Sequence, residues 1–376
     1  MTRAFVKQSR KILEQNLLKS GETLLIVTPH EYDQDFISSF LEAAAEIGAV
    51  GGHLAVIPRA DDYGLAKGLT EWHLNLLASA DLVITTKVGA GPGPNIADFG
   101  HWGGKVGHHP YRVDREFVLR EGSKTRWLSI GIFILDSLMR TMYFPTTERA
   151  ALSLTCAEIL DKAKEMRITS DAGSDLVMKK GGRPGSCEYG FADSPGRWDN
   201  FGYSCIASAP YEDSAEGTLV LEPGDMIPDL KPYPVLTEPL RLDFKDGYVT
   251  EIEGGETGKF LRRYLASYGE KEAYGISHAG WGTHEKAKLP LGEYWTTLDS
   301  SYDANIGMFH HNAIGSILVS LGDNYGLGLG GKNLKYSGLG PSTRRSMSHT
   351  HFTCYNGNFF CDEEKIIGNG KLILKV

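Results

Sequence analysis

The stretch TLLIVTP, Thr23 to Pro29, followed by FISSFLEAAAEIGA, Phe36 to Ala49, decides the fold class. The first segment is a continuous apolar run, which is typical of a strand buried on both faces of a parallel sheet. The second places apolar residues at helical spacing and is bounded by glycines, which predicts a helix packed on that sheet. A strand followed by such a helix predicts a crossover unit of the α/β class.

The same alternation continues through the first half of the chain. Helical patterns recur in LTEWHLNLLASA and in TTERAALSLTCAEILDKAKEMR, which spans Thr146–Arg167. Further apolar runs predict strands at HLAVIP from His53, at Asp81–Thr86 and at Arg126–Phe133. We therefore expect an α/β domain with a parallel sheet over residues 1–167.

Beyond residue 167 the pattern changes to short strand-like pieces separated by glycine turns. In LRLDFKDGYVTEIEGG, the pair Asp246 and Gly247 is a strong signal for a tight β-hairpin turn. A single helical stretch, GETGKFLRRYLASYG, interrupts the strands. We expect an α+β domain over residues 168–376.

Composition narrows the class of protein. The 376 residues suit about two domains, and 39 basic against 47 acidic residues give a net charge of −8. Nucleic acid and anionic membranes are therefore poor partners, and no apolar run approaches the roughly 20 residues of a membrane span. We expect a cytoplasmic protein whose five cysteines are free thiols. No GxGxxG follows the first strand, which argues against a nucleotide site.

Histidines carry the strongest chemical signal. His349 and His351 in SHTHFTCYNG are two residues apart, so in a strand their side chains project from the same face. His278 lies in KEAYGISHAGWGTHEKAKLP, where flanking glycines allow another backbone to approach closely. A third imidazole from a separate strand would complete a three-ligand metal site. Hydrogen-bonded histidines without a metal remain the alternative at this point.

Two further clusters are candidates for contacts around such a site. His310 and His311 are adjacent, so at most one of them is expected to face it. In CEYGFADSPGRWDNFG, Glu188 is a carboxylate and Arg197 a cation. In the same segment, Trp198 offers a flat surface and Asn200 can hydrogen-bond a polar ligand. A Pro-Gly turn carrying a surface ion pair is the alternative interpretation of this segment.

Three of these stretches together resemble a known family. PGRWDNFG, ISHAGWG and the final His-x-His, in this order and at these separations, resemble the 2,5-dihydroxypyridine 5,6-dioxygenase family. The fold of that family is shared with the thermophilic-type leucyl aminopeptidases. The likeness is clearest from Gly185 to the C-terminus, and it implies an aminopeptidase-like fold with metal-binding chemistry in the second domain.

The resemblance implies metal ligands and two departures from the family. In that family a mononuclear Fe(II) is held by the His of the GWG box and by a His-x-Asp pair, which correspond here to His278 and His349. His351 stands where the family has Asp, so the resemblance implies a three-His iron site with a more electrophilic metal. Asn200 stands where the family tends to have a His, and an amide cannot carry a proton at neutral pH.

The activity that the resemblance implies is an Fe(II)-dependent, non-heme, ring-cleaving dioxygenase. Its substrates would be O₂ and a small hydroxylated aromatic or N-heterocycle, and the protein would be a homo-oligomer. In this hypothesis Glu188 takes the substrate proton and His310 or His311 orients the intermediate. Trp198 or Trp281 would stack on the ring.

Alternatives come from the same ligand set. Three histidines and a water also form a catalytic zinc site, so a mononuclear zinc or manganese hydrolase, a ring deaminase or an aminopeptidase-related enzyme stays open. A two-metal peptidase is disfavoured because the carboxylates that bridge two cations are missing from these motifs. A non-catalytic binding protein is the remaining possibility.

Overall fold

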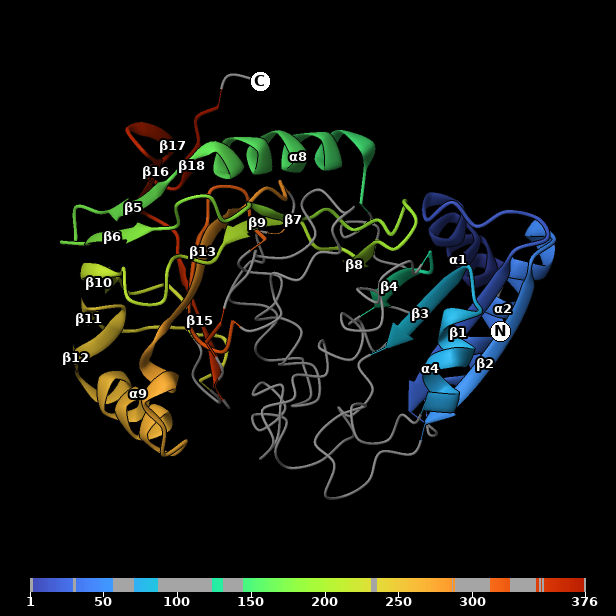
Figure 1. Ribbon diagram of the computed structural model, residues 1–376, viewed down its shortest axis with the longest axis horizontal. Helices are drawn as coiled ribbons and strands as arrows, with labels where there is room; N and C mark the ends of the chain where they lie inside the picture. Colours follow the sequence, from blue (N-terminus) through green and yellow to red (C-terminus); the bar gives the residue numbers. More distant parts are fainter. Residues whose placement is uncertain are drawn as a thin grey trace.

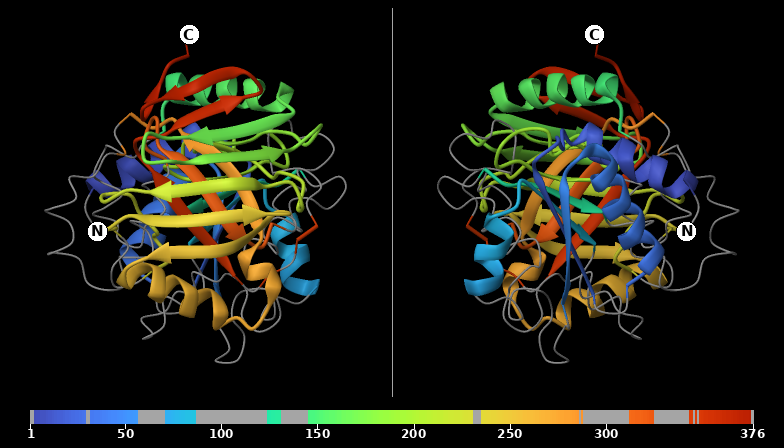
Figure 2. Two further views of the ribbon diagram at one scale, coloured as in Figure 1. Left: turned by 90° about the vertical axis from the view of Figure 1, so that its left-hand side faces the viewer. Right: turned by 90° about the vertical axis from the view of Figure 1, so that its right-hand side faces the viewer.

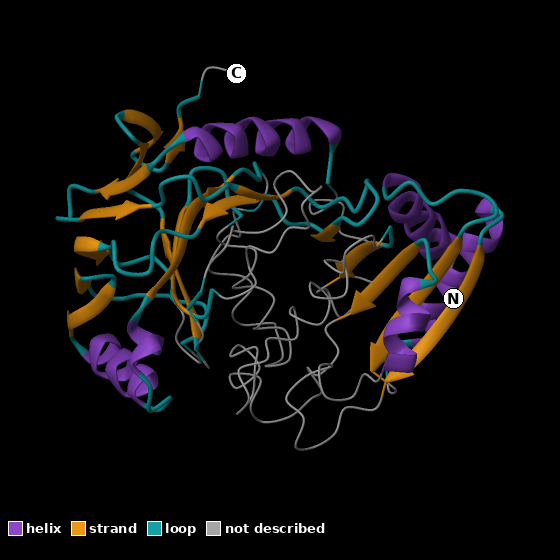
Figure 3. Cartoon of the chain, in the orientation of Figure 1, coloured by secondary structure: helices purple, strands orange, loops and turns teal. Residues whose placement is uncertain are grey.

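The computed structural model describes residues 3–29, 32–56, 71–86, 124–130, 145–230, 235–285, 287, 312–324, 343–344, 346 and 348–374. Within these ranges the chain forms two parts that lie side by side (Figure 1). One part is a five-stranded sheet with helices, and the other contains an eight-stranded and a second five-stranded sheet. Figure 3 shows the same division by secondary structure.

Sheet A, the five-stranded sheet of the first part, is parallel throughout and has the order β2-β1-β3-β4-β8. Its strands are β1 (Thr23–Pro29), β2 (Val50–Val56), β3 (Leu82–Thr86), β4 (Arg126–Ile130) and β8 (Trp198–Asn200). The accompanying helices are α1 (Arg3–Gln15), α2 (Gln34–Ile47) and α4 (Glu71–Ala78). This arrangement confirms the α/β class predicted from the first strand and helix.

Helix α2 shows how local chemistry sets its boundaries. The Asp33 side chain accepts hydrogen bonds from the backbone N–H groups of Asp35 and Phe36, which satisfies donors that the first turn leaves open. Gly48 ends the helix in the left-handed conformation at φ 86°. Phe36 and Phe40 are buried in one apolar cluster with residues of α1, β1, β3 and β4, which fixes the helix on the sheet.

Sheet B is the eight-stranded antiparallel sheet, in the order β12-β11-β10-β6-β5-β16-β17-β18. Its strands are β5 (Glu165–Thr169), β6 (Asp175–Lys179), β10 (Glu216–Leu221), β11 (Leu240–Lys245), β12 (Tyr248–Gly254), β16 (Asn358–Cys361), β17 (Glu364–Gly368) and β18 (Lys371–Leu372). Asp246 and Gly247 join β11 to β12 with φ of 50° and 77°, as the Asp-Gly hairpin signal predicts. Figure 2 (left) shows these strands stacked across the face of the molecule.

Sheet C is the second five-stranded sheet, antiparallel, in the order β15-β14-β13-β9-β7. Its strands are β7 (Ser186–Glu188), β9 (Cys205–Ser208), β13 (Ile276–Gly282), β14 (Ile317–Gly322) and β15 (His349–Cys354). The remaining helices are α8 (Thr147–Lys162), α9 (Glu256–Ala266) and the 3₁₀ turn η3 (Lys271–Tyr274). Helix α8 contacts β7 and β9, and α9 contacts β12.

The main core lies between sheets B and C. Apolar residues of sheet B such as Leu219 and Leu242, of α8 such as Leu160, and of sheet C such as Trp281 and Phe352 form one cluster. Because side chains alternate along a strand, only one face of sheet C contributes to this cluster. The side chains on the opposite face of sheet C lie outside this cluster.

Two boundaries differ from the sequence prediction. The helix predicted to reach Arg167 ends at Lys162, because Glu165–Thr169 pairs with β6 and β16 as strand β5. The boundary at residue 167 also does not separate the sheets completely, since β8 pairs in parallel with β4 and so adds a strand from the second half to sheet A. The Thr146 side chain caps α8 by accepting from the N–H of Arg149.

Two predictions can be compared with the described residues: that the cysteines are free thiols and that no segment is suited to span a membrane. All five cysteines are free and buried, as expected. Burial raises the pKa of Cys156 to about 11 and that of Cys361 to about 12, so these thiols stay protonated at neutral pH. Over the described ranges, none of the helices has the length and hydrophobicity needed to span a membrane.

Candidate metal centre

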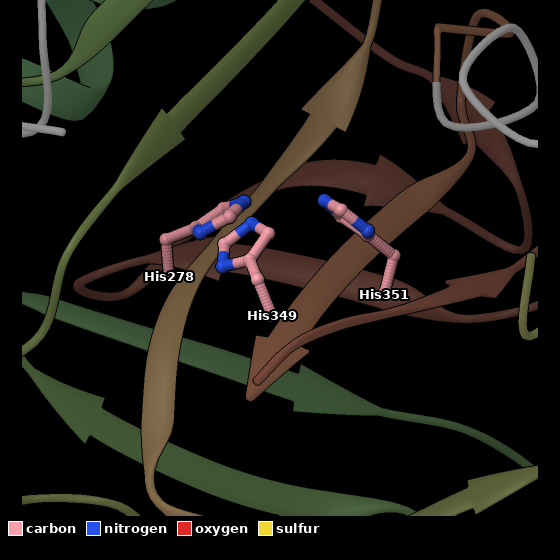
Figure 4. A group of neighbouring side chains, drawn as sticks. All are labelled: His278, His349 and His351. Carbon is pink, nitrogen blue, oxygen red and sulfur yellow. The ribbon is translucent and has the colours of Figure 1, made fainter. Parts of the chain in front are cut away.

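Three histidines from two strands converge on one point. His278 lies on β13, and His349 and His351 lie on β15. One ring nitrogen of each can be chosen so that all three lie within 4.8 Å of one another. The residues are 7%, 5% and 9% exposed, and their rings point toward one another (Figure 4). The structure therefore brings together the three residues that the sequence analysis proposed as metal ligands.

The register of sheet C explains this convergence. Strand β14 lies between β13 and β15, and its Ser320 is paired with His278 on one side and with His351 on the other. Residues paired directly across strands share a face, and His349 shares it because it precedes His351 by two positions. The Ser320 Oγ lies 3.1 Å from His278 Nε2, so the hydroxyl sits between the imidazoles.

Hydrogen bonds fix how two of the rings are protonated. His349 Nδ1 lies 2.8 Å from the carbonyl oxygen of Asp323, which can only accept, so Nδ1 carries the proton. Ser277 donates its hydroxyl proton to the same carbonyl at 2.9 Å, so its oxygen accepts from His278 Nδ1 at 3.0 Å. Nε2 is therefore the unprotonated nitrogen of both rings. In His278 it accepts from the Ser320 hydroxyl at 3.1 Å, and a bound metal would take the place of that proton donor.

The third ring is held by a carboxylate. Asp229 Oδ2 lies 3.2 Å from His351 Nδ1 and accepts the backbone N–H of His351 at 2.6 Å. A carboxylate behind a histidine favours the Nδ1–H tautomer and leaves Nε2 for a cation. All three imidazoles thus share one protonation pattern, and the donor set of three neutral nitrogens fits a divalent transition metal.

The glycines of the GWG box allow the close backbone approach that their positions predicted. A Cβ atom on Gly280 would lie 1.8 Å from the carbonyl oxygen of Ile206 in β9. On Gly282 it would lie 2.4 Å from the backbone of Asn312 and Ala313. Neither position has space for any other residue, which is why both flank Trp281 in β13.

Glu188 and Asn200 lie together but at a distance from the histidines. Asn200 Nδ2 donates to Glu188 Oε2 at 3.1 Å, which links β7 of sheet C to β8 of sheet A. Glu188 of β7 pairs with Cys205 of β9, and Cys205 pairs in turn with Gly282 of β13. Gly282 is four residues beyond His278, so the two positions lie on the same face of the sheet. At ~3.4 Å per residue this is about 14 Å along the strand, so the carboxylate does not contact the imidazoles directly.

Arg197 is held in a buried network with Asp199 and backbone carbonyls. It is 2% exposed, and its guanidinium donates to Asp199 at 2.5 Å and to the carbonyls of Phe191 and Cys187. Burial raises the pKa of Asp199 to about 7, and the guanidinium opposes that rise. Arg197 was predicted to contact the substrate, but its guanidinium forms a buried ion pair with Asp199. Removing either partner would leave the charge of the other buried and uncompensated.

Trp281 is also placed differently from the prediction. It is fully buried in the core between sheets B and C, where its ring packs at 5.0 Å from that of Phe359. Trp281 is three residues from His278, and an odd separation in a strand puts two side chains on opposite faces. Trp281 therefore stabilises the core and does not stack on a substrate held by the histidines.

The remaining predicted residues stay predictions. His310 and His311 lie outside the described residues. Trp198 contributes its backbone to β8, but the position of its side chain is likewise outside the description.

Among the described residues, sequence reasoning missed four groups that touch the histidines: the Ser277 hydroxyl, Ser320, the Asp323 carbonyl and Asp229. Asp229 is 122 positions from His351 and lies in a segment without a motif, so no spacing rule connects them. Ser320 lies in the apolar run that follows His310 and His311, and the alternation of that run was the one available signal.

Comparisons with known proteins agree with this geometry. The NicX family model, described as 2,5-dihydroxypyridine 5,6-dioxygenase, matches residues 116–373. The 2,5-dihydroxypyridine 5,6-dioxygenase of Pseudomonas putida KT2440 is 32% identical over 267 residues, which is 69% of this chain and 70% of that protein. The match thus begins well before Gly185, where the motifs made the likeness clearest.

Two solved structures share the fold. The structure of 2,5-dihydroxypyridine dioxygenase from Pseudomonas putida KT2440 has a TM-score of 0.75 at 24% identity and covers 98% of this chain and 96% of that chain. Wild-type AmpT from Thermus thermophilus has a TM-score of 0.61 at 15% identity and covers 99% of both chains. These likenesses confirm the predicted fold class, including its relation to the aminopeptidase-like proteins.

The family assignment rests on the extent of the sequence match. The family model covers residues 116–373 of the 376, and the curated relative matches more than two thirds of both chains. The chain therefore belongs to the 2,5-dihydroxypyridine 5,6-dioxygenase family, a family of ring-cleaving dioxygenases.

Proposed function

We propose that this chain is a mononuclear, non-heme Fe(II) dioxygenase that opens the ring of a small hydroxylated aromatic or N-heterocycle, with 2,5-dihydroxypyridine as the first candidate. His278, His349 and His351 would be the metal ligands. The observation that carries the proposal is their convergence in a buried position, with one ring nitrogen of each within 4.8 Å of the others. The relative whose name specifies that substrate supports the choice of ring.

The residues present fit an iron ion. Imidazole nitrogen suits Fe(II), and three ligands on one face leave positions for a substrate oxygen and for O₂. When bound, Fe(II) would supply a cation that favours the anionic form of a substrate hydroxyl and a redox centre that lets O₂ react. The burial of the histidines keeps water away from the ligands, which strengthens every electrostatic interaction there.

The chain's own residues would position the substrate and move its proton. Glu188 lies on the histidine-bearing side of sheet C, about 14 Å along the strand from His278, where it could meet the far side of a bound ring. Asn200 donates to Glu188 and so orients that carboxylate. We propose Glu188 as the proton acceptor, with His310 or His311 and Trp198 as contacts to the ring.

A second function is favoured by one observation. Among the described residues, the group of potential ligands at this site contains three imidazoles and no carboxylate, which is also a catalytic zinc set. Zinc would lower the pKa of water to about 7 and support a hydrolase or a ring deaminase. Donor type alone does not distinguish iron from zinc.

Oxygen consumption separates the two functions. The protein is purified without oxygen, its metal content is measured, and it is stripped and reloaded with Fe(II) or Zn²⁺. With 2,5-dihydroxypyridine or dihydroxybenzenes, we expect ring opening only with Fe(II), at one O₂ consumed per substrate. The stripped protein is the control, and turnover supported by zinc without O₂ uptake would contradict the proposal. Sedimentation of the same sample checks the predicted homo-oligomer.

A further inference from the structure

Strand β15 is the edge strand of sheet C, and a short segment covers its outer edge. Three alternate residues, at positions 351, 353 and 355, contact residues 225–229. The contacts are from Tyr355 N–H to Asp225 at 2.9 Å, in both directions between Met226 and Thr353 at 3.0 and 2.8 Å, and from His351 N–H to Asp229 at 2.6 Å. The segment therefore satisfies the hydrogen-bonding groups that an edge strand leaves open.

One of these contacts does more than cover the edge. The Asp229 oxygen that accepts the backbone N–H of His351 also lies 3.2 Å from Nδ1 of the same residue. The two side chains are 9% and 11% exposed, so this contact is largely shielded from water. A carboxylate in this place fixes the orientation of the ring and favours the tautomer with the proton on Nδ1.

Charge gives the contact a second consequence. Three neutral imidazoles bring no negative charge, whereas a divalent cation in a buried site is costly without one. Among the described residues, Asp229 is the carboxylate whose oxygen contacts one of the three rings. His349 and His278 are oriented instead by a carbonyl oxygen and a hydroxyl, which carry no net charge.

We propose that Asp229 is the positioning residue of the metal centre: it orients His351 and supplies, from behind the imidazole, the negative charge that the ligands lack. This inference rests on the proposed metal site. It goes beyond that site because it assigns part of the metal affinity to a residue that would not touch the metal.

A structural role alone would have a different signature. Asp229→Asn keeps a side-chain oxygen that can accept the backbone N–H of His351, so the edge of β15 stays covered. The substitution removes only the negative charge. If Asp229 merely held the segment in place, metal binding would be the same in the two proteins.

Asp225 offers a matched control. It lies in the same segment, is 3% exposed, and its side chain accepts the backbone N–H groups of Glu222 and Tyr355. Asp225→Asn removes a carboxylate that is at least as buried from the same segment. We expect it to alter the stability of the metal-free protein while leaving metal affinity within about twofold of wild type.

The experiment is a Co²⁺ titration of the stripped full-length protein, followed by the visible absorption of the bound ion. Asp229→Asn should weaken Co²⁺ binding about 10–100-fold and change the spectrum, as losses of such outer partners do. Metal-free samples are compared by thermal melting, which should show that Asp229→Asn remains folded. In a His351→Asp background the ligand carries its own charge and has no Nδ1–H, so Asp229→Asn should no longer weaken binding.

The outcomes separate this inference from the proposed function. Equal Co²⁺ affinity and spectrum in wild type and Asp229→Asn, with no binding by His278→Ala, would overturn the inference and leave the metal site standing. Wild-type affinity in His278→Ala would overturn both. Weaker binding by Asp229→Asn in the wild-type background, but not beside His351→Asp, is the result that establishes the role of Asp229.

Discussion

The two faces of strands β13, β14 and β15 differ sharply in chemistry. The core face carries Ala279, Trp281, Ile317, Val319, Leu321, Phe352 and Cys354, all of which belong to the main apolar cluster, together with the buried Thr350. The opposite face, which we call the histidine face, carries one large apolar residue, Leu318, beside His278, Gly280, Ser320, Gly322, His349, His351 and Thr353. Both faces are buried, so exposure to solvent does not explain the difference.

The comparison shows that residues which stabilise the core alternate, along the same strands, with residues which could bind a metal. Burying a polar side chain costs free energy unless it is hydrogen-bonded, whereas burying an apolar one contributes about 1.5–3 kcal/mol. The histidine face is therefore less favourable for folding than an apolar face would be. Such local conflicts are expected at functional sites, which agrees with the metal centre proposed here.

The largest effect should follow from removing one ligand of the histidine face. Since loss of an outer partner costs about 10–100-fold in metal affinity, His278→Ala should lose more than about a hundredfold. Metal content after gel filtration measures this, and ring cleavage should disappear with it. The melting temperature of the metal-free variant should stay close to that of wild type. If His278→Ala retained its metal, the histidine face would not be the metal centre.

Neighbouring residues in β15 give the sharpest contrast in stability. Phe352 is fully buried in the core, so Phe352→Ala should lower the free energy of unfolding by about 3–5 kcal/mol. His351→Ala should cost less, about 1–2 kcal/mol in the metal-free protein, because it removes polar contacts such as that with Asp229 and no part of the apolar core. Denaturant unfolding of both stripped proteins is the measurement. Equal losses of unfolding free energy would show that the core face does not contribute more to stability than the histidine face.

A smaller effect should arise where the histidine face meets the backbone of β9. Gly280→Ala would place a Cβ 1.8 Å from the Ile206 carbonyl, and overpacking of this kind costs about 1–3 kcal/mol. Gly52→Ala in β2 is the control, since its nearest neighbour would be at 3.7 Å. Thermal melting of the two variants should differ. If Gly280→Ala had the melting temperature of wild type, the close approach of the Ile206 carbonyl would not restrict residue 280 to glycine.

The smallest effect concerns an ion pair just beyond the end of β13. Glu285 accepts from Arg149 at 2.7 and 3.0 Å, and this hydrogen bonding lowers the pKa of Glu285 to about 2. A lowered folded-state pKa gives stability that is present above about pH 4.5 and lost as the pH falls toward 2. Because Glu285 is half exposed, the contribution should stay below about 1 kcal/mol.

The pH dependence of unfolding checks the role of this pair. Glu285→Gln should be slightly less stable than wild type at neutral pH, and the difference should vanish between pH 4.5 and 2. Metal affinity at neutral pH should not change. A difference that persists at pH 2 would mean that Glu285 acts through packing and not through its charge.

Much of the fold could be predicted because the deciding signals are local. The apolar run at Thr23–Pro29, the helix after Asp33 and the Asp246–Gly247 turn each depend on a few neighbouring residues. The pairing of β8 with sheet A could not be foreseen in this way. Its three residues, Trp198–Asn200, carry no strand signal of their own, and only tertiary contacts place them beside β4.

The candidate site was predictable where motif and strand geometry agree. The two-residue spacing placed His349 and His351 on one face, and the glycine-flanked motif around His278 added a third candidate that the family resemblance then supported. The same geometry argues against Trp281 as a substrate contact, since it is three residues from His278 in one strand. Asp229 could not be foreseen, because only the folding of its segment against β15 brings it to His351.

The location of the metal tests the central claim most directly. Crystals grown without oxygen from iron-loaded protein would be measured at the iron absorption edge. One anomalous peak within ~2.0–2.3 Å of the Nε2 atoms of His278, His349 and His351 is the expected result, as for other metal–imidazole bonds. Iron found elsewhere on the protein, with these three rings unliganded, would contradict the assignment of the histidine face as the metal centre.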